Sequence, residues 1–439
     1  MPSHEDYDRA RDRRTLERAR SRLSGWRGIR LIFLLAGPGI LTFLGENDAP
    51  SMLSYAATGA QFGIGFFLPF VISTFAVAFV VQEMAARIGS ATGQGHAELI
   101  FARFGRFWGR FAMADLFIGN FLTLITEFIG IRAGLGFFGV PPAIAIAGSI
   151  VIIGLAISTS RYRTWERITL VLAFGNAIFL PVALLAHPDF HAIGAALLTW
   201  NPLPGGFHPD VMTLMMADIG ATVTPWMLFF QQGTVADKGL TPGELTGARF
   251  DTGIGAALAA LFGIAAIVAT APLFVHHISP TAFQSAQFAQ ALEPWIGRFG
   301  ASLFALGIFE AGLVAVITIS TASAYAVHEV LGTPHSLNIP LKEGWRFYAV
   351  LLGTALIAGG LTLIPGAPLE DIVILVNVVA TLAMPPAMLF LLVLANDREV
   401  MGAYRNGWMA NIAGIGVTAL LIACGLGFTL IVLFPHLVG

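Results

Sequence analysis

The chain has 439 residues, of which 56% are hydrophobic and 11% are charged, and its mean hydropathy is +0.77. A soluble domain carries about 25% charged residues, so this composition excludes a soluble globular protein and indicates a polytopic membrane protein. The formal net charge is only −2, and Cys424 is the single cysteine, which excludes an intrachain disulfide and a thiolate metal cage.

The N-terminal segment, residues 1–30, is polar and rich in arginine, and it lacks the short apolar core of a cleaved signal peptide. About 20 apolar residues are needed to cross the hydrocarbon core as a helix, which makes each later apolar run a candidate span. We predict an all-α protein with about eleven transmembrane helices, at 31–58, 64–86, 112–138, 141–158, 167–187, 208–232, 252–276, 300–327, 346–365, 371–395 and 408–434.

Basic residues are unevenly distributed among the connections between these spans. All of the 24 Lys and Arg residues except Arg132 and Arg298 fall in the N-terminal segment or in alternate connections. Connections rich in Lys and Arg stay on the cytoplasmic side. We therefore expect a multi-pass protein of the cell inner (plasma) membrane, with a cytoplasmic N-terminus and, because the number of spans is odd, an extracytoplasmic C-terminus.

Two of the predicted spans are interrupted by proline beside polar residues. The first contains G-E-N-D-A-P-S-M from Gly45, and the sixth contains M-A-D-I-G-A-T-V-T-P-W from Met216. Breaks that lie five spans apart are typical of inverted five-helix repeats, whose first and sixth helices unwind at mid-membrane and line a cavity. We expect a first repeat over 31–187, a second, inverted repeat over 208–395 and an additional helix at 408–434.

Asp48, in the first break, is the leading candidate for ligand binding. An ionised carboxylate inside a span costs several kcal/mol unless a positive charge compensates it, and no Lys or Arg is expected at the same depth. A bound cation is therefore its natural partner. The alternative is a structural one, with Asp48 capping the helix that restarts after the break.

Four stretches of the sequence resemble the Nramp family of divalent-metal transporters. They are GPGILTFLGENDAPSMLSYAATGAQFG in the first span, QEMAARIGSATGQGHAEL in the second, GATVTPWMLFFQ in the sixth and NVVATLAMPPAMLFLLVLANDREVMG in the tenth. The resemblance runs from Gly37 to about Gly402. It implies the LeuT-type 5+5 inverted repeat and transport of a divalent metal ion.

The resemblance also implies a set of metal ligands, with informative departures from the family pattern. The family aspartate falls on Asp48, its asparagine on Ser51, its sixth-span methionine on Thr224 and its tenth-span glutamine on Asn377. Thr224 in place of a soft thioether leaves oxygen donors, which suit Mg²⁺, Ca²⁺ and Mn²⁺. The expected ligand set is Asp48, Ser51, Thr224, Asn377, the carbonyl groups near Gly45 and Ala221, and Glu127. Asp218 lies outside the family pattern and is a further candidate, which could attract the ion in a vestibule.

The residues that the family is thought to use for proton coupling also differ. Trp226 stands where the family has a histidine and Leu124 where it has an aspartate, while Glu127 matches a family glutamate. For Glu127 we expect metal binding or a structural hydrogen bond. These departures resemble the Nramp-related magnesium transporters and favour uncoupled transport of Mg²⁺, and also Mn²⁺, by alternating access. The alternative is an ordinary proton-coupled Mn²⁺/Fe²⁺ transporter that uses Glu127.

Other classes of protein are disfavoured by the sequence. It has no H-E-x-x-H and no paired intramembrane aspartate motif, so we expect no enzyme activity, no cofactor, no nucleic-acid partner and no required protein partner. An amino-acid transporter on the same fold is disfavoured because Asp48 would repel the substrate carboxylate. Two further acids stand within predicted spans: Glu46 is a candidate for attracting the ion in a vestibule, and Glu310 is expected to be a protonated or hydrogen-bonded helix contact.

Overall fold

A computed structural model describes residues 37–201, 203, 206, 209–278, 285–366 and 369–433. The segment 1–30 and the beginning of the first predicted span lie outside this part. The regular structure of the described residues is helical: α3 (Pro38–Glu46), α4 (Ala49–Phe62), α5 (Phe67–Thr92), α6 (His96–Phe104), α7 (Arg106–Gly136), α8 (Pro142–Ile157), α9 (Tyr162–Ala173), η1 (Phe174–Ile178), α10 (Phe179–Leu185), α11 (Phe190–Thr199), α12 (Pro209–Gly220), α13 (Pro225–Lys238), η2 (Pro242–Glu244), α14 (Leu245–Val275), α15 (Ser285–Leu331), α16 (Trp345–Leu361), α17 (Leu369–Asn396), α18 (Arg398–Met401), η3 (Gly402–Tyr404) and α19 (Trp408–Leu433).

Each predicted span corresponds to a helix or to a chain of short helices. Within the described ranges, eight helical stretches are long and apolar enough to cross a membrane, and α8 and α16 are shorter apolar helices. The first span consists of α3 and α4, the fifth of α9, η1 and α10, and the sixth of α12 and α13. The prediction of eleven membrane-crossing segments agrees with this architecture.

Three local features differ from the expected pattern. The connection between the fifth and sixth predicted spans, residues 188–207, contains α11, and Asp189 caps that helix by accepting hydrogen bonds from His191 N at 2.8 Å and Ala192 N at 3.1 Å. The eighth span begins earlier than predicted, since α15 includes a segment before a kink at Gly297, where φ is +69°. The fifth span is interrupted by the 3₁₀ segment η1, which contains Gly175 and Asn176 and was not predicted.

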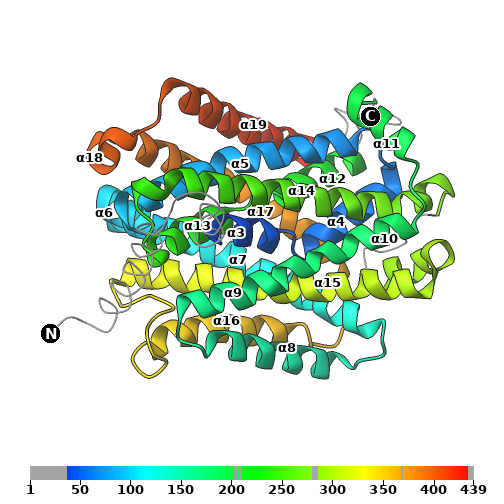
Figure 1. Cartoon of the computed structure of the whole chain (residues 1–439), viewed down its shortest axis with the longest axis horizontal. Helices are drawn as coiled ribbons and strands as arrows, with labels where there is room; N and C mark the ends of the chain where they lie inside the picture. Colours follow the sequence, from blue (N-terminus) through cyan, green and yellow to red (C-terminus); the bar gives the residue numbers. More distant parts are fainter. Residues whose placement is uncertain are drawn as a thin grey trace, which may run out of the picture.

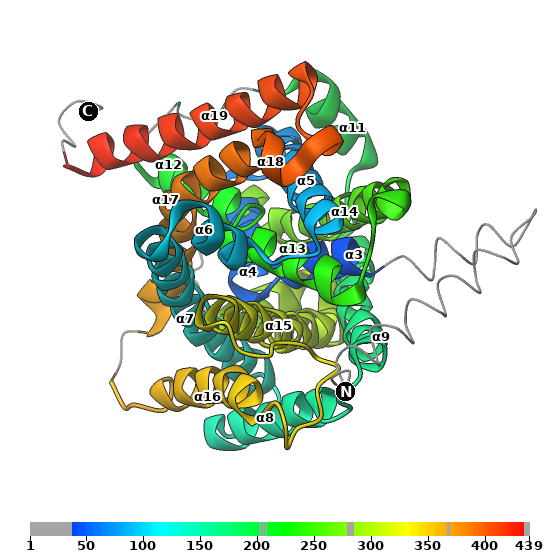
Figure 2. The ribbon, with the colours of Figure 1, turned by 90° about the vertical axis from the view of Figure 1, so that its left-hand side faces the viewer.

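The helices are arranged as a core of broken helices inside a ring of continuous ones. Viewed along the bundle in Figure 2, α3, α4, α13 and α15 lie near the centre, with α5, α7, α14 and α17 around them and α8, α16 and α19 at the outside. Figure 1 shows that α5 ends, and α7, α14 and α16 begin, at the left-hand end of the bundle, where the connections carry most of the Lys and Arg residues.

Glycine allows α14 to lie directly against both halves of the first span. A Cβ on Gly39 would lie 2.6 Å from the backbone of Thr252, and one on Gly59 would collide with the carbonyl oxygen of Ile267. Lipid tails are as apolar as the side chains, so the hydrophobic effect does not drive helices together inside a membrane. Small residues instead let the helix backbones approach closely and pack by van der Waals contact. The close contact fixes α3 and α4 on either side of the break.

Candidate functional site

The first break lies between α3 and α4. Asn47 has φ −71° and ψ 53°, and Asp48 has φ −78° and ψ 176°, so neither residue is helical. The chain becomes helical again at Ala49, and Pro50 occupies a first-turn position, where a missing N–H breaks no helical hydrogen bond. The Asp48 carboxylate accepts a hydrogen bond from Ser51 N at 2.8 Å, so the capping role considered from the sequence is present.

Neighbouring helices hold this break in place. Asn47 Nδ2 donates to the carbonyl oxygen of Ala259 on α14 at 2.9 Å, and Asn176 Nδ2 in η1 donates to that of Leu44 at 3.1 Å. Both asparagine side chains are buried, and each donates to a backbone carbonyl oxygen. The position of Asp48 is therefore set by packing and hydrogen bonding rather than by a flexible loop.

The second break lies between α12 and α13. Thr224 is extended, with φ −116° and ψ 153°, and Pro225 starts α13. The carbonyl oxygen of Ala221 accepts a hydrogen bond from Tyr55 Oη at 2.9 Å. A Cβ on Gly220 would collide with the carbonyl oxygen of Asn377, so α17 touches the second break directly.

Glu46 connects the two breaks, which the sequence did not predict. Thr224 Oγ1 donates to Glu46 Oε2 at 2.8 Å, across a sequence separation of 178 residues. Glu46 is completely buried and its Oε1 atom has no hydrogen-bond partner. Its place beside Asp48 was the available signal, but a spacing of two residues does not indicate that Glu46, the last residue of α3, faces the second break.

Glu127 and Asp218 both have structural partners around α4. Glu127 Oε2, on α7, accepts a hydrogen bond from Ala49 N at 3.1 Å, which matches the expected structural role. Asp218, on α12, accepts from Ser54 Oγ at 2.8 Å and Thr58 Oγ1 at 2.9 Å. Metal binding by these two acids stays a prediction.

Several polar atoms at the breaks are buried without a hydrogen-bond partner. A buried polar atom left unpaired costs about 1–3 kcal/mol, so a bound ion or its water would stabilise this arrangement. The amide of Asn377 offers an oxygen to such a ligand if it turns by half a rotation about its terminal bond. The unpaired atoms near the breaks are Glu46 Oε1, Asn47 Oδ1, Ser51 Oγ, Glu127 Oε1 and Asn377 Nδ2.

The donor set is poor in charged ligands. Within the described residues, no three His, Cys, Asp or Glu side chains are grouped so that they could hold a metal ion together. An ion at the breaks would therefore meet one or two carboxylates and otherwise neutral oxygens. Asp48, Ser51, Thr224 and Asn377 each expose at most 4% of their surface, so the candidate ligands are buried.

Apolar side chains occupy two positions at which the family that the sequence resembles has a titratable residue. Trp226 is buried, and its ring makes an edge contact with that of Phe230 at a centroid distance of 5.6 Å. A Cβ on Gly45 would lie 3.3 Å from the Trp226 ring, which places the indole against the first break. Leu124 is fully buried. Neither side chain can carry a proton.

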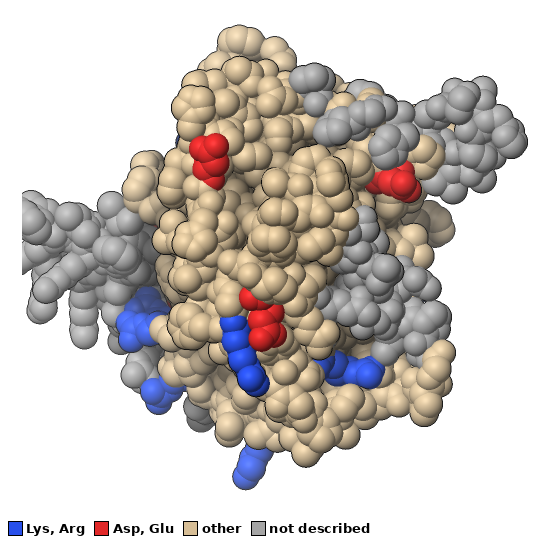
Figure 3. Space-filling view, turned by 90° about the vertical axis from the view of Figure 1, so that its right-hand side faces the viewer, with Lys and Arg blue, Asp and Glu red and all other residues tan. Residues whose placement is uncertain are grey.

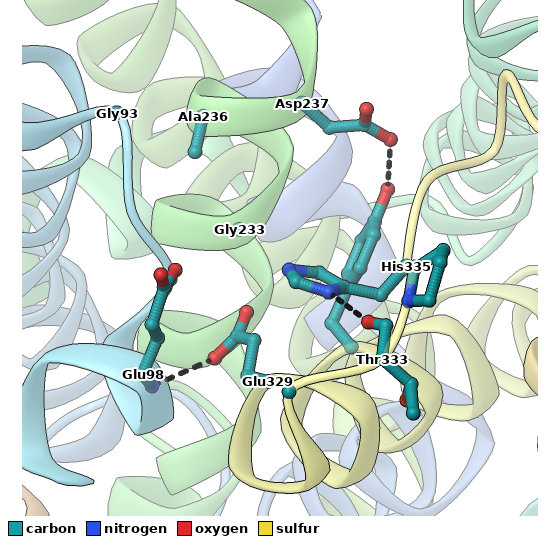
Figure 4. Close-up of a pocket in the computed structure, with 12 residues that line it drawn as sticks. Gly93, Glu98, Gly233, Ala236, Asp237, Glu329, Thr333 and His335 are labelled. Carbon is teal, nitrogen blue, oxygen red and sulfur yellow. Dashed lines mark hydrogen bonds between the residues drawn. The ribbon is translucent and has the colours of Figure 1, made fainter. Parts of the chain in front are cut away.

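A polar cavity of about 400 Å³ lies at the basic end of the bundle, beyond α13. Figure 4 shows Glu98, Asp237 and Glu329 around it. Asp237 accepts a hydrogen bond from Tyr325 Oη at 2.7 Å, and Glu329 accepts one from Glu98 N at 3.3 Å. The opposite end, seen in Figure 3, shows only scattered acidic and basic side chains on its visible surface.

These features define a polytopic helical membrane protein with two proline-broken helices that meet at a buried, oxygen-rich site. The crystal structure of the amino-acid-bound protein MhsT superposes with a TM-score of 0.55 at 14% identity, over 90% of this chain and 97% of that one. The overlap agrees with the LeuT-type fold.

The chain belongs to the Nramp family: the model of the natural resistance-associated macrophage protein-like family matches residues 39–431. Members of this family are membrane transporters, not enzymes. The chain is 25% identical to the divalent metal cation transporter MntH of Aeromonas hydrophila, over 88% of this chain and 93% of that protein. It is 27% identical to MntH of Verminephrobacter eiseniae, over 94% and 92%. A crystal structure of the Eremococcus coleocola manganese transporter superposes with a TM-score of 0.74 at 19% identity, over 92% of this chain and 87% of that one.

Proposed function

We propose that the chain carries divalent metal ions across the plasma membrane by alternating access, with Mg²⁺ as a main substrate and Mn²⁺ as a second one. The observation that carries the proposal is the contact between the two breaks, where the Thr224 hydroxyl donates to Glu46, two residues before Asp48, in buried surroundings. The ion would be held by Asp48, Ser51, Thr224, Asn377 and the carbonyl groups near Gly45 and Ala221. The names of the MntH relatives support a divalent metal as the cargo.

The preference for Mg²⁺ rests on the ligand type. Thr224, directly before the proline of the second break, offers a hydroxyl oxygen rather than a soft sulfur. Mg²⁺ takes oxygen ligands in octahedral geometry and usually keeps several waters, so it needs few carboxylates and room for water. Oxygen donors also bind Mn²⁺, which is why we include it as a substrate.

Transport without protons rests on the groups beside the ion. Trp226 and Leu124 cannot titrate, and Glu127 uses one of its oxygens to accept from Ala49 N. The competing function is proton-coupled transport of Mn²⁺ or Fe²⁺. The observation that favours it is the unpaired Oε1 atom of Glu127, which has room for a proton or a water.

The proposed direction of access follows the charge distribution. The end rich in Lys and Arg would face the cytoplasm, with the N-terminus on that side and the C-terminus outside. The cavity at this end, with Glu98, Asp237 and Glu329 in its lining, would serve as the cytoplasmic vestibule. Acidic walls in a low-dielectric cleft concentrate cations.

Direct binding of Mg²⁺ tests the proposed site independently of any transport assay. Isothermal titration of the purified protein with Mg²⁺ should give a binding isotherm that Asp48→Ala removes. Asp115→Asn is the matched control, because it removes an acidic charge on α7 outside the site and should leave binding unchanged. Equal Mg²⁺ affinity in the wild type and in Asp48→Ala would reject the proposed site.

A further inference from the structure

The interruption of the fifth span faces an unpaired acid on α15. Both carboxylate oxygens of Glu310 are buried and have no hydrogen-bond partner. The carboxyl group fills a notch at Gly175 in η1, because a Cβ on this glycine would lie 2.6 Å from Glu310 Cδ. The 3₁₀ segment therefore provides both the space and the neighbour for this acid.

The next residue of η1 also carries an unpaired oxygen. Asn176, the residue after Gly175, is fully buried, and its Oδ1 atom has no hydrogen-bond partner. Its Nδ2 atom donates to the carbonyl oxygens of Leu44, at 3.1 Å, and Ala173, at 3.3 Å. These two bonds fix the orientation of the amide group, and its oxygen receives no hydrogen bond.

No basic group in the described structure pairs with Glu310, and Arg132 on α7 donates to the carbonyl oxygen of Thr362 instead. The two elements that face it, η1 and α10, contain no titratable side chain. The backbone carbonyl of Glu127 on α7 lies against Gly312 of α15. Gly312 is two residues after Glu310, so the two face different sides of that helix. Glu46 on α3 is bonded to Thr224, and Glu166 on α9 pairs with Lys238 at 2.8 Å.

An isolated carboxylate in a span is costly unless it is neutralised. A proton would neutralise Glu310, with its new O–H group donating to an acceptor such as Asn176 Oδ1. A small cation would be shared by the carboxylate and by the same neutral oxygens. One carboxylate balances a single positive charge, which favours a monovalent ion over a divalent one.

We propose that Glu310 and Asn176, at the 3₁₀ break of the fifth span, form a second cation site that binds a monovalent cation, either Na⁺ or a proton. The site is separate from the divalent-metal site and goes beyond the proposed function. It links α15 to the fifth span and, through the bond between Asn176 and Leu44, to the end of α3 ahead of Asp48. Its occupancy therefore stabilises the arrangement in which α3, η1 and α15 are packed together.

Carbodiimide labelling tests this site without any transport assay. A carbodiimide reacts with a protonated carboxyl group in apolar surroundings, and peptide mass spectrometry can measure the modification of Glu310 in the full chain. The modification should fall as the pH rises, approaching about tenfold per pH unit on the alkaline side of the midpoint. Na⁺ in place of choline at constant ionic strength and pH should lower it further if Na⁺ is the occupant; pH dependence alone would identify the proton. No modification under any condition, or modification that ignores both pH and Na⁺, would overturn the proposal.

Thermal stability provides a second test with an isosteric variant. If labelling identifies Na⁺, this ion should raise the unfolding midpoint of the wild type relative to choline, and Glu310→Gln should lose this increase while keeping the side-chain volume. If labelling identifies the proton, the midpoint of the wild type should depend on pH more than that of Glu310→Gln. An unchanged response in Glu310→Gln would reject the site. Asp48→Ala should keep the response, so failure of the divalent-metal proposal would leave this result intact.

Discussion

The two breaks are built alike but contribute different chemistry. Each consists of a short unwound stretch, an extended residue and a proline in the first turn of the next helix. The first break brings the acids Glu46 and Asp48, whereas the second brings the hydroxyl group of Thr224 and the carbonyl group of Ala221. The negative charge of the site therefore comes from the first broken helix, and neutral oxygen ligands come from the second. We infer that the first break determines whether a cation binds and that the second determines which cation is preferred.

Removing the acid of the first break should have the largest effect. Asp48→Ala should reduce uptake of Mg²⁺ and Mn²⁺ into proteoliposomes to the level of empty vesicles, because the remaining donors are neutral or engaged with other groups. Metal-sensitive dyes inside the vesicles measure both ions. Uptake of either ion at the wild-type rate would place the binding site elsewhere.

Changing the ligand type of the second break should alter selectivity more than activity. Thr224→Met adds a soft thioether and removes the hydroxyl that donates to Glu46. The ratio of Mn²⁺ to Mg²⁺ uptake should rise on the order of tenfold, equivalent to about 1.4 kcal/mol. Thr222→Met is a matched control, since the Thr222 hydroxyl bonds to carbonyl groups of its own helix. The same ratio in Thr224→Met and wild type would contradict a contact between Thr224 and the ion.

Glu127 separates the two proposed coupling modes. Glu127→Gln keeps an oxygen that can accept from Ala49 N, so transport should continue. The free energy of unfolding should fall by about 1 kcal/mol. Mg²⁺ uptake and the thermal unfolding midpoint measure the two effects. Loss of metal uptake together with loss of acidification would instead support the proton-coupled alternative.

A change outside both breaks should have the smallest effect. Partial burial raises the pKa of Asp397, but hydrogen bonds from Glu399 N and Arg103 outweigh this and hold the pKa below its ordinary value. A lowered pKa contributes stability above the unfolded-state pKa, and this contribution is lost as the pH falls through the folded-state pKa. Asp397→Ala also removes the cap of α18 and should cost about 1 kcal/mol at neutral pH. Its unfolding midpoint should depend less on acidic pH than that of the wild type, while its metal selectivity stays unchanged; altered selectivity would contradict the assignment to the breaks alone.

The number of spans and the positions of both breaks could be predicted from sequence, because apolar run length and proline beside polar residues are local signals. The bond between Glu46 and Thr224 could not, since it depends on how two distant breaks face each other. The same holds for Glu310: its acidity within a span was visible, but the notch at Gly175 depends on how the 3₁₀ segment of the fifth span packs against α15. Local patterns specify where a helix stops, whereas packing decides which groups then meet.

Simultaneous recording of internal Mg²⁺ and internal pH in proteoliposomes tests the central claim most directly. With an inward Mg²⁺ gradient, the oxygen-rich site and the apolar residues Trp226 and Leu124 predict Mg²⁺ entry without acidification, at a rate that a pH gradient does not change. Mn²⁺ entry with acidification and without any Mg²⁺ signal would contradict the account and assign the chain to proton-coupled manganese transport.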